Sequence, residues 1–322
     1  MPTLATLYGP IAADLERFGR IFDDELSSDV PVVRALCDQV RGYRGKMLRP
    51  ALLLLSGRAC ERVTDAHHTL AAVVELVHLA TLVHDDVLDE ADLRRRLPTI
   101  NLLHGNEAAV LLGDYLISHA FHLCSALDSQ YASRTIGSTT NTVCEGELQQ
   151  ISHRDDDTLT VNEYYQIITK KTAVLTGTCC LLGAHYADAG AATIAAFERY
   201  GMDVGVAFQI TDDVLDIVGS RENMGKTLGR DLDQHKLTLP LIHCLGEADR
   251  DDRAELQALL AAPAPDHDRL NALLGATDSI DYALETARRH VDSAVACLAD
   301  LPASDARDAL VRLAQMILER EQ

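Results

Sequence analysis

Two clusters of aspartates have the spacing of residues that could do chemistry together. In each, two adjacent aspartates are followed by a third, four positions after the first, and an apolar run precedes them; the clusters are Asp85, Asp86 and Asp89, and Asp212, Asp213 and Asp216. Residues four apart lie on one face of a helix. A single cluster would also fit a solvated helix end. Buried carboxylates, however, need a compensating cation, and magnesium is typically coordinated by carboxylate oxygens together with substrate phosphates. Two clusters therefore predict a cavity that holds magnesium and a polyphosphate.

Lysine usage is the second informative feature. The chain has 29 lysines and arginines together, and only five of them are lysines. A lysine kept against this bias marks a position where a compact point charge is useful, unless it survived by chance. The five are Lys46, Lys170, Lys171, Lys226 and Lys236.

The totals fit one cytoplasmic domain over residues 1–322. Hydrophobic residues make up 47% of the chain but aromatic residues only 4%, so Leu, Ala, Val and Ile must fill the core, and this composition favours helices. A net charge of −20 argues against binding to nucleic acid or to anionic membranes. The eight cysteines do not have the spacing of metal ligands, so we expect them to be buried, reduced thiols. With no signal peptide and no apolar run of spanning length, we expect no stable membrane insertion.

The hydrophobic periodicity predicts helices joined by short turns, with no strand pairs. The expected helices are 4–26, 31–40, 51–59, 64–89, 105–127, 131–151, 160–186 and 191–218, followed by helical hairpins after Pro240, with a polar loop at 219–234. Thr160 and Glu163 have the spacing of a capping box, and Asp155 to Asp157 suit a solvated loop. The glycine-rich basic turn from Arg41 to Arg49 precedes a helix and could hold an anion, although many such turns are simply solvated.

Taken together, these landmarks resemble a trans-prenyl diphosphate synthase of the polyprenyl synthetase family. The matching motifs are Gly45-Lys46-x-x-Arg49-Pro50, Asp85-Asp86-x-x-Asp89 followed by Arg94-Arg95, Lys171-Thr172-Ala173, Gln209 before Asp212-Asp213-x-x-Asp216, Gly225-Lys226, and Lys236 to Pro240. Four of the five lysines stand at positions that this family uses to bind diphosphates. The chain departs from the family pattern at Arg96, where a glycine commonly follows the arginine pair. We expect a loop to tolerate Arg96, although this residue could change the orientation of the Arg94 and Arg95 side chains.

The resemblance implies an all-α fold, an antiparallel helical bundle around a central active-site cavity, usually in a homodimer. It also implies a prenyltransferase that ionises an allylic diphosphate, joins the carbocation to isopentenyl diphosphate and then loses a proton. Three magnesium ions are expected to neutralise the departing pyrophosphate. Their expected ligands are Asp85, Asp86, Asp89, Asp212, Asp213 and Asp216.

The same resemblance assigns the basic and polar residues. Arg94, Lys171 and Lys226 would hold the allylic diphosphate, while Lys46, Arg49, His78 and Arg95 would hold isopentenyl diphosphate, with Lys236 also binding substrate. Thr172 and Gln209 would place oxygens against the carbocation. The catalytic set is therefore Lys171, Thr172, Gln209, Asp85 and Asp212. His78 shares a helix face with Asp85, seven residues later, although a lone histidine on an apolar helix is also typical of a core.

Three alternatives remain open at this point. A terpene cyclase also ionises allylic diphosphates, but its second metal motif usually differs and it uses aromatic residues that this chain lacks. A non-catalytic subunit of a heteromeric synthase would be expected to lose aspartates or basic ligands. Product length is the third: Ala80 and Thr81 stand where short-chain enzymes of the family often have aromatic residues. We therefore expect a product longer than farnesyl diphosphate, with geranylgeranyl diphosphate as the alternative to a medium or long chain.

Overall fold

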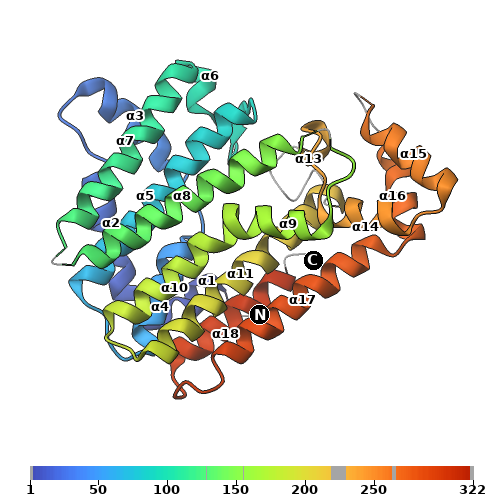
Figure 1. Ribbon diagram of the computed structural model, residues 1–322. Helices are drawn as coiled ribbons and strands as arrows, with labels where there is room; N and C mark the ends of the chain where they lie inside the picture. Colours follow the sequence, from blue (N-terminus) through green and yellow to red (C-terminus); the bar gives the residue numbers. More distant parts are fainter. Residues whose placement is uncertain (1–2, 128, 155, 219–229, 263–265, 320–322) are drawn as a thin grey trace. The chain divides into compact units, whose positions relative to one another are not determined.

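The computed structural model describes residues 3–127, 129–154, 156–218, 230–262 and 266–319, and these residues are helical apart from turns and one small hairpin (Figure 1). Their contacts group into two compact units. Unit 1 comprises Met1–Thr140, Leu175–Gly201 and Cys297–Leu313; unit 2 comprises Asn141–Val174, Met202–Ala296 and Ala314–Gln322. The expected all-α class is confirmed.

Unit 1 is organised around helix α5 (Asp65–Leu88), which packs against α2 (Ala12–Glu25), α4 (Leu48–Ala59) and α7 (Asn106–Ser125). Its other elements are α1 (Leu4–Leu7), the 3₁₀ helix η1 (Gly9–Ile11), α3 (Pro31–Arg41), strands β1 (Leu93–Arg94) and β2 (Leu97–Pro98), and α6 (Ile100–His104). Most apolar residues of α5 and α4 are completely buried, Leu52 to Leu55 and Leu70 among them, whereas Leu88 at the C-terminal end of α5 is 42% exposed. This packing fixes both ends of α5.

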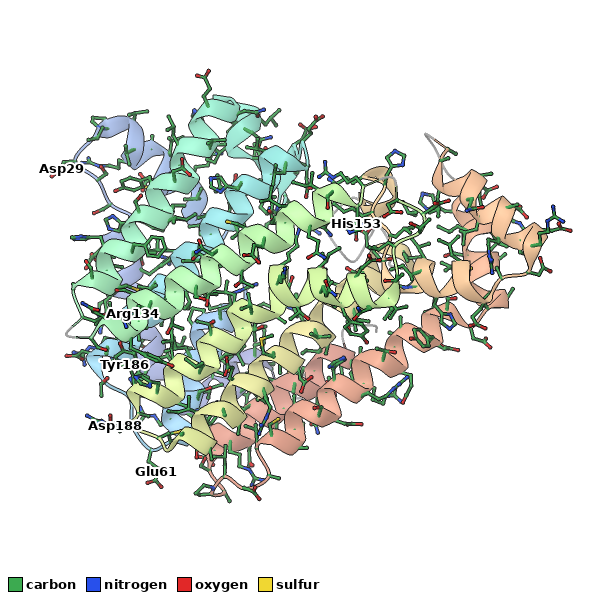
Figure 2. All side chains as sticks on the ribbon, viewed as in Figure 1. Asp29, Glu61, Arg134, His153, Tyr186 and Asp188 are labelled. Carbon is green, nitrogen blue, oxygen red and sulfur yellow. The ribbon has the colours of Figure 1, made fainter. Side chains whose placement is uncertain are left out.

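The N-terminal end of α5 is closed by its own side chains and by neighbouring turns. Thr64 and His67 form a capping box, and the other ring nitrogen of His67, Nε2, lies 2.9 Å from the carbonyl oxygen of Gly183. Arg62, the residue after Glu61, forms an ion pair with Asp188 at this end of the unit, where Figure 2 labels Glu61 and Asp188. Glu61 and Asp188 both have the positive φ at which a chain commonly leaves a helix. The aspartates of α5 are at its opposite end.

Five longer helices have residues in both units. They are α8 (Gln130–Ser152), α10 (Val174–Tyr186), α11 (Ala191–Val218), α17 (Ser279–Cys297) and α18 (Asp305–Leu318). Unit 2 adds α9 (Val161–Ile168), the π-helical segment η2 (Thr169–Ala173), α13 (Arg230–Asp233), α14 (Leu239–Glu247), α15 (Arg250–Leu260) and α16 (His267–Ala276). Helix α14 packs against α9, α15 and α16 around a core that includes Leu241, Leu256 and Leu273.

The observed elements correct the sequence expectations in four places. The expected helix 4–26 is divided into α1, η1 and α2, because Gly9 and Pro10 interrupt the helical hydrogen bonds. The expectation of no paired strands is wrong, since β1 and β2 form an antiparallel hairpin. The helix expected at 160–186 is interrupted by η2, and α13 occupies part of the expected polar loop, of which residues 219–229 lie outside the described residues.

Two segments are long and apolar enough to cross a membrane by composition alone. They are Asp65–Leu88 and Val161–Tyr186, and 72% of the apolar window is buried in each. Such burial is what core helices of a folded bundle show, so these segments are weak evidence for a membrane span. Cys124, Cys179, Cys180 and Cys244 are buried free thiols, as the sequence predicts.

Candidate active site

The first aspartate cluster stands at the C-terminal end of α5. Asp85 and Asp89 are partly exposed, and the amide of Asp89 closes the helix by donating to the carbonyl of Asp85 at 2.8 Å. The C-terminal end of a helix carries a partial negative charge, so carboxylates there are unfavourable unless a cation is present. The placement of these two side chains therefore suits a divalent cation.

Asp86 has a different environment from its two neighbours. It is buried, and its Oδ1 accepts hydrogen bonds from Nε and Nη2 of Arg94 at 2.9 and 2.7 Å. The side-chain amide of Asn101 donates to the backbone carbonyl of Asp86 at 3.2 Å. Asp86 thus holds the hairpin arginine against the end of α5, a role that the spacing of the motif does not reveal.

The β1–β2 hairpin presents the arginine pair. Leu93 pairs with Pro98 and Arg94 with Leu97, which leaves Arg95 and Arg96 as a two-residue turn. Both have positive φ, 51° and 67°, the combination that type I′ hairpin turns require and that glycine adopts most easily. This explains physically why glycine is common after the arginine pair, and it shows how the turn accommodates Arg96.

We expect Arg96→Gly to raise the free energy of unfolding by up to about 1 kcal/mol, because it relieves a left-handed conformation that is costly for a residue with a Cβ atom. Urea denaturation would measure the change. Arg96→Ala is the matched control, since it removes the charge but keeps the Cβ atom. Equal stabilisation by both substitutions would show that charge repulsion, not backbone conformation, is the source of the effect.

A basic cluster surrounds a buried carboxylate beside the hairpin. Burial raises the pKa of Glu75, and the positive charges of Arg49, Arg95 and Arg44 oppose that shift. Burial, followed by the charges of Arg49, Arg94 and Arg95, lowers the pKa of His78 well below its usual value, so this imidazole is neutral at pH 7.

One atom of the cluster is poorly satisfied within the protein. Among the described residues, Nε of Arg49 is buried without a hydrogen-bond partner. A concentration of guanidinium groups around one carboxyl, with an unused donor, suits the binding of an anion. His78, Arg49 and Glu75 therefore lie in one cluster, and the assignment of His78 and Arg49 to isopentenyl diphosphate stays a prediction.

The Lys46 turn leads from this cluster into α4. Lys46 is exposed, and its carbonyl accepts a hydrogen bond from the hydroxyl of Tyr8 at 2.8 Å. A Cβ atom on Gly45 would lie 2.1 Å from Nη2 of Arg95, so only glycine allows the arginine to approach the turn this closely. The Lys46 turn and the hairpin turn are therefore in direct contact, which brings Lys46 and Arg95 into one region of unit 1.

The second aspartate cluster lies near the C-terminal end of α11, in unit 2. Asp212 and Asp216 are partly exposed, and Asp213 is buried. The backbone amide of Asp231 donates to Oδ2 of Asp216 at 3.0 Å. Burial and the nearby charge of Asp216 raise the pKa of Asp231 to about 6. Asp231 is thus a fourth carboxyl group in this region, which sequence reasoning missed because only its place before Lys236 pointed to it.

Lys236 belongs to the same region. Its backbone amide donates to the carbonyl of Asp231 at 2.8 Å, and its ammonium group donates to the side chain of Gln234. The positive charge of Lys236 opposes the rise in the pKa of Asp231 that burial and Asp216 cause. Lys226 and Gly225 lie outside the described residues, so their assignments remain predictions.

Lys171 and Thr172 are carried by the π-helical segment η2. Short π-helical turns within α-helices are rare overall, and those that occur are frequently found at functional sites. Nζ of Lys171 lies 2.7 and 2.9 Å from the two carboxylate oxygens of Glu147 and 2.7 Å from the side-chain oxygen of Gln150. A Cβ atom on Gly146 would lie 2.6 Å from the backbone nitrogen of Lys171, so α8 and η2 pack in backbone contact.

Four side chains of unit 2 form a continuous hydrogen-bonded line. The hydroxyl of Thr172 donates to Oε1 of Gln209 at 2.8 Å, and Nε2 of Gln209 donates to Oδ1 of Asp213 at 2.8 Å. The hydroxyl of Tyr164 donates to Oδ2 of Asp213 at 2.6 Å. Burial, followed by the charge of Asp231, raises the pKa of Asp213 well above its usual value, while the two donors lower it.

The aspartates fit a hard divalent cation by the chemistry of their donors. Within the described ranges, no three side chains of His, Cys, Asp or Glu already form a metal-binding group. Asp85, Asp89, Asp212 and Asp216 nevertheless offer oxygen donors at the C-terminal portions of two helices, where magnesium or calcium would relieve the accumulated negative charge. The residues that fit a metal best are therefore these four.

Comparisons with known proteins agree with the motifs. The sequence model of the polyprenyl synthetase family matches residues 30–276. Octaprenyl diphosphate synthase of Escherichia coli is 31% identical over 312 residues, which cover 96% of this chain and 97% of that protein. The all-trans-nonaprenyl-diphosphate synthase of Rhodobacter capsulatus, described as geranyl-diphosphate specific, is 34% identical and covers 98% of both chains.

Solved structures have the same fold over nearly the whole chain. A polyprenyl synthase from Caulobacter crescentus, complexed with calcium and isoprenyl diphosphate, has a TM-score of 0.93 at 32% identity and covers 99% of this chain and 98% of its own. A decaprenyl diphosphate synthase from Rhodobacter capsulatus also has a TM-score of 0.93, at 31% identity, covering 99% and 100%. This chain therefore belongs to the polyprenyl synthetase family and has its all-α isoprenoid synthase fold.

Proposed function

We propose that this protein is an all-trans polyprenyl diphosphate synthase that joins isopentenyl diphosphate to an allylic diphosphate and makes a product longer than farnesyl diphosphate. The observation that carries the proposal is the match over nearly the whole chain to relatives named as octaprenyl and nonaprenyl diphosphate synthases. The two aspartate-terminated helices and the basic cluster around Glu75 support it, because the reaction needs groups that bind two diphosphates.

The proposed roles of the described residues are supported by their environments. Asp85, Asp89, Asp212 and Asp216 would hold divalent cations, for which we propose three magnesium ions. When bound, these ions neutralise the charge that develops on the departing pyrophosphate. Arg94, held by Asp86, and Lys171, held by Glu147, would bind the allylic diphosphate together with Lys226.

Isopentenyl diphosphate would bind to the basic cluster. Arg49 offers a buried donor, Arg95 extends from the hairpin turn, and neutral His78 can hydrogen-bond a phosphate oxygen without adding charge. Lys46 would add a mobile point charge at the exposed edge. Thr172 and Gln209 would place oxygens beside the carbocation, and Lys236 would support the region around Asp231.

We also propose a cytoplasmic homodimer in which each chain acts as one functional domain. The support is the negative net charge, the burial of both long apolar segments, and the fact that five helices have residues in both compact units. Analytical ultracentrifugation of the purified protein would test the oligomeric state, and a monomer at micromolar concentration would contradict it.

Turnover with radiolabelled isopentenyl diphosphate, magnesium and geranyl or farnesyl diphosphate tests the function. We expect radiolabel in an allylic product, and chromatography after dephosphorylation would give its length. Release of pyrophosphate without uptake of isopentenyl diphosphate would indicate a cyclase, and no turnover would indicate a non-catalytic subunit. A product of geranylgeranyl length would overturn the medium-to-long assignment but not the reaction.

The two diphosphate subsites should respond differently to the loss of a lysine. We expect Lys46→Ala mainly to raise the Michaelis constant for isopentenyl diphosphate, and Lys171→Ala mainly to lower kcat and weaken binding of the allylic substrate. Each effect should be on the order of tenfold to a hundredfold, as for the loss of a charge-assisted contact. Steady-state kinetics with each substrate varied would measure both.

Lys170→Ala is the matched control for this comparison. Lys170 is adjacent to Lys171 but lies 3.4 Å from Glu145, and its side chain is 36% exposed. Its loss should leave both Michaelis constants nearly unchanged. If Lys46→Ala and Lys171→Ala show the same defect toward both substrates, the division into two subsites is wrong.

A further inference from the structure

Tyr8 stands between α1 and η1 and reaches the turn that leads into α4. Its backbone amide closes α1 by donating to the carbonyl of Leu4 at 2.9 Å, and its hydroxyl donates to the backbone carbonyl of Lys46 at 2.8 Å. These two partners are 38 residues apart in the sequence. Tyr8 also lies before residues 30–276, which the family model matches, so no motif draws attention to it.

The residues on both sides of Tyr8 anchor it to unit 1. Leu7 and Ile11 are buried, and η1 packs against α2 and α4. The backbone around Tyr8 is therefore held by packed apolar side chains, although it lies near the start of the chain. This packing lets the N-terminal segment Leu4–Ile11 present a side chain to the Lys46 turn in a defined position.

The hydroxyl of Tyr8 is a permanent donor in this contact. Burial, followed by the charge of Glu75, raises the pKa of Tyr8 above its usual value, so the hydroxyl keeps its proton at neutral pH. A carbonyl oxygen can only accept, so the single hydrogen of the phenol is directed at Lys46. The influence of Glu75 also places Tyr8 near the carboxyl around which the basic cluster gathers.

The backbone of the Lys46 turn has an unfavourable conformation that its surroundings must hold. Met47 is the N-cap residue of α4, and it has a φ of 51° and makes no capping hydrogen bond with its side chain. The carbonyl of Met47 accepts the first helical hydrogen bond, from the amide of Ala51 at 3.0 Å. The carbonyl of Lys46 thus stands one residue before the helical hydrogen bonds begin, and Tyr8 engages it there.

We propose that Tyr8 is a positioning residue for the isopentenyl diphosphate subsite, and that it acts through the carbonyl of Lys46 to hold the flexible lysine side chain where it meets the diphosphate. The inference rests on the proposed function, which assigns Lys46 to that substrate. It makes the segment Leu4–Ile11 a working part of the active site. Because the contact is exposed, water can replace the phenol at the carbonyl, so its loss loosens the turn without unfolding the protein.

Tyr8→Phe tests this proposal, because it removes only the hydroxyl group. We expect the Michaelis constant for isopentenyl diphosphate to rise about threefold to tenfold, as for the loss of one hydrogen bond. The value of kcat, the Michaelis constant for the allylic substrate and the magnesium requirement should stay within about twofold. Steady-state kinetics with each substrate varied would measure this. A larger change in kcat or in the allylic Michaelis constant than in that for isopentenyl diphosphate would overturn the proposal.

Tyr200→Phe is the matched control, because it removes the same kind of hydrogen bond elsewhere in unit 1. The hydroxyl of Tyr200 donates to the backbone carbonyl of Leu310 at 2.7 Å, and the side chain of Tyr200 is completely buried. Its loss should lower the melting temperature at least as much as Tyr8→Phe does, and leave the Michaelis constant for isopentenyl diphosphate unchanged. An equal rise of that constant in both variants would show a general loss of stability and reject the proposal.

A double-mutant cycle tests whether Tyr8 acts through Lys46. In a Lys46→Ala background the side chain that Tyr8 positions is gone, so we expect Tyr8→Phe to cause little further rise in the Michaelis constant for isopentenyl diphosphate. If the two effects multiply instead, Tyr8 does not act through Lys46, and the proposal is overturned.

Tyr8→His provides a second route if Tyr8→Phe does not fold, because it keeps an aromatic ring that is too short to reach the carbonyl of Lys46. The same selective rise is expected, and an unchanged Michaelis constant for isopentenyl diphosphate would reject the inference. Wild-type turnover must be measured in the same assay. If the wild type does not incorporate radiolabelled isopentenyl diphosphate, the proposed function itself fails; if it does, wild-type kinetics for Tyr8→Phe reject this inference alone.

Discussion

Asp85→Ala and Asp212→Ala should each lower turnover on the order of a thousandfold while the protein stays folded, because each removes an oxygen donor from a group that neutralises the departing pyrophosphate. Both side chains are partly exposed, so their loss leaves no buried cavity. Each also lies near the C-terminal end of its helix, where removing a negative charge relieves repulsion. The thermal stability of the metal-free protein should therefore be unchanged or slightly raised.

Steady-state kcat and thermal unfolding followed by circular dichroism would measure the two effects separately. Asp292→Ala is the control, since Asp292 is an exposed aspartate of α17 outside both motifs. Magnesium together with a diphosphate analogue should raise the melting temperature of the wild type but not of Asp85→Ala. Near-wild-type turnover in either folded variant would refute the metal assignment.

Thr81→Phe should shift the product toward about fifteen to twenty carbons, because each isoprene unit advances the chain by roughly one helical turn along α5 and an aromatic ring one turn before Asp85 would stop it there. Thr81 is partly exposed, and its hydroxyl donates to the carbonyl of His78 within the helix at 2.7 Å. The substitution therefore breaks no long-range contact of that hydroxyl. Turnover should be largely retained, since the metal ligands are untouched.

Ala80→Phe should shorten the product in the same way, but with a larger loss of stability. Ala80 is completely buried, and an added ring there must displace neighbouring side chains. Leu82→Phe is the control, because Leu82 lies about 100° round α5 from Thr81, on the edge of the helix that carries His78. Chromatography of the dephosphorylated products would measure chain length. If both Ala80→Phe and Thr81→Phe leave it unchanged, the hydrocarbon does not run along this face of α5.

The long helices were predictable because their signals are local. The sequence predicts a helix at 64–89 and the structure has Asp65–Leu88; for 191–218 the bounds agree with Ala191–Val218. Long apolar runs at helical spacing, with a capping residue at Thr64, are enough for this. The η2 segment carries no such local signal, and its close backbone contact with Gly146 joins residues that are far apart in the sequence.

The site was predictable only as far as residue type and spacing reach. Asp85 and Asp86 are equivalent in sequence, yet one is partly exposed and the other is buried against Arg94. Glu75 reads as an interruption of an apolar run until the arginines around it are seen. Tyr164 and Asp231 gain their importance from residues far away in the chain, and one sequence without contacts cannot supply that information.

The π-helical turn at Thr169–Ala173 has a consequence for how this chain can change during evolution. A π-helical turn holds about one residue more than an α-helical turn, so a helix that contains one has its later residues out of phase with its earlier ones. Lys171 and Thr172 sit within that change of phase. Deleting one residue from this turn would restore a regular helix and leave the residues on both sides facing as they do now, whereas making the turn α-helical at its present length would rotate all later residues by roughly 100°. A substitution in this segment therefore changes one side chain at a time, whereas an insertion or deletion changes the geometry of the whole turn.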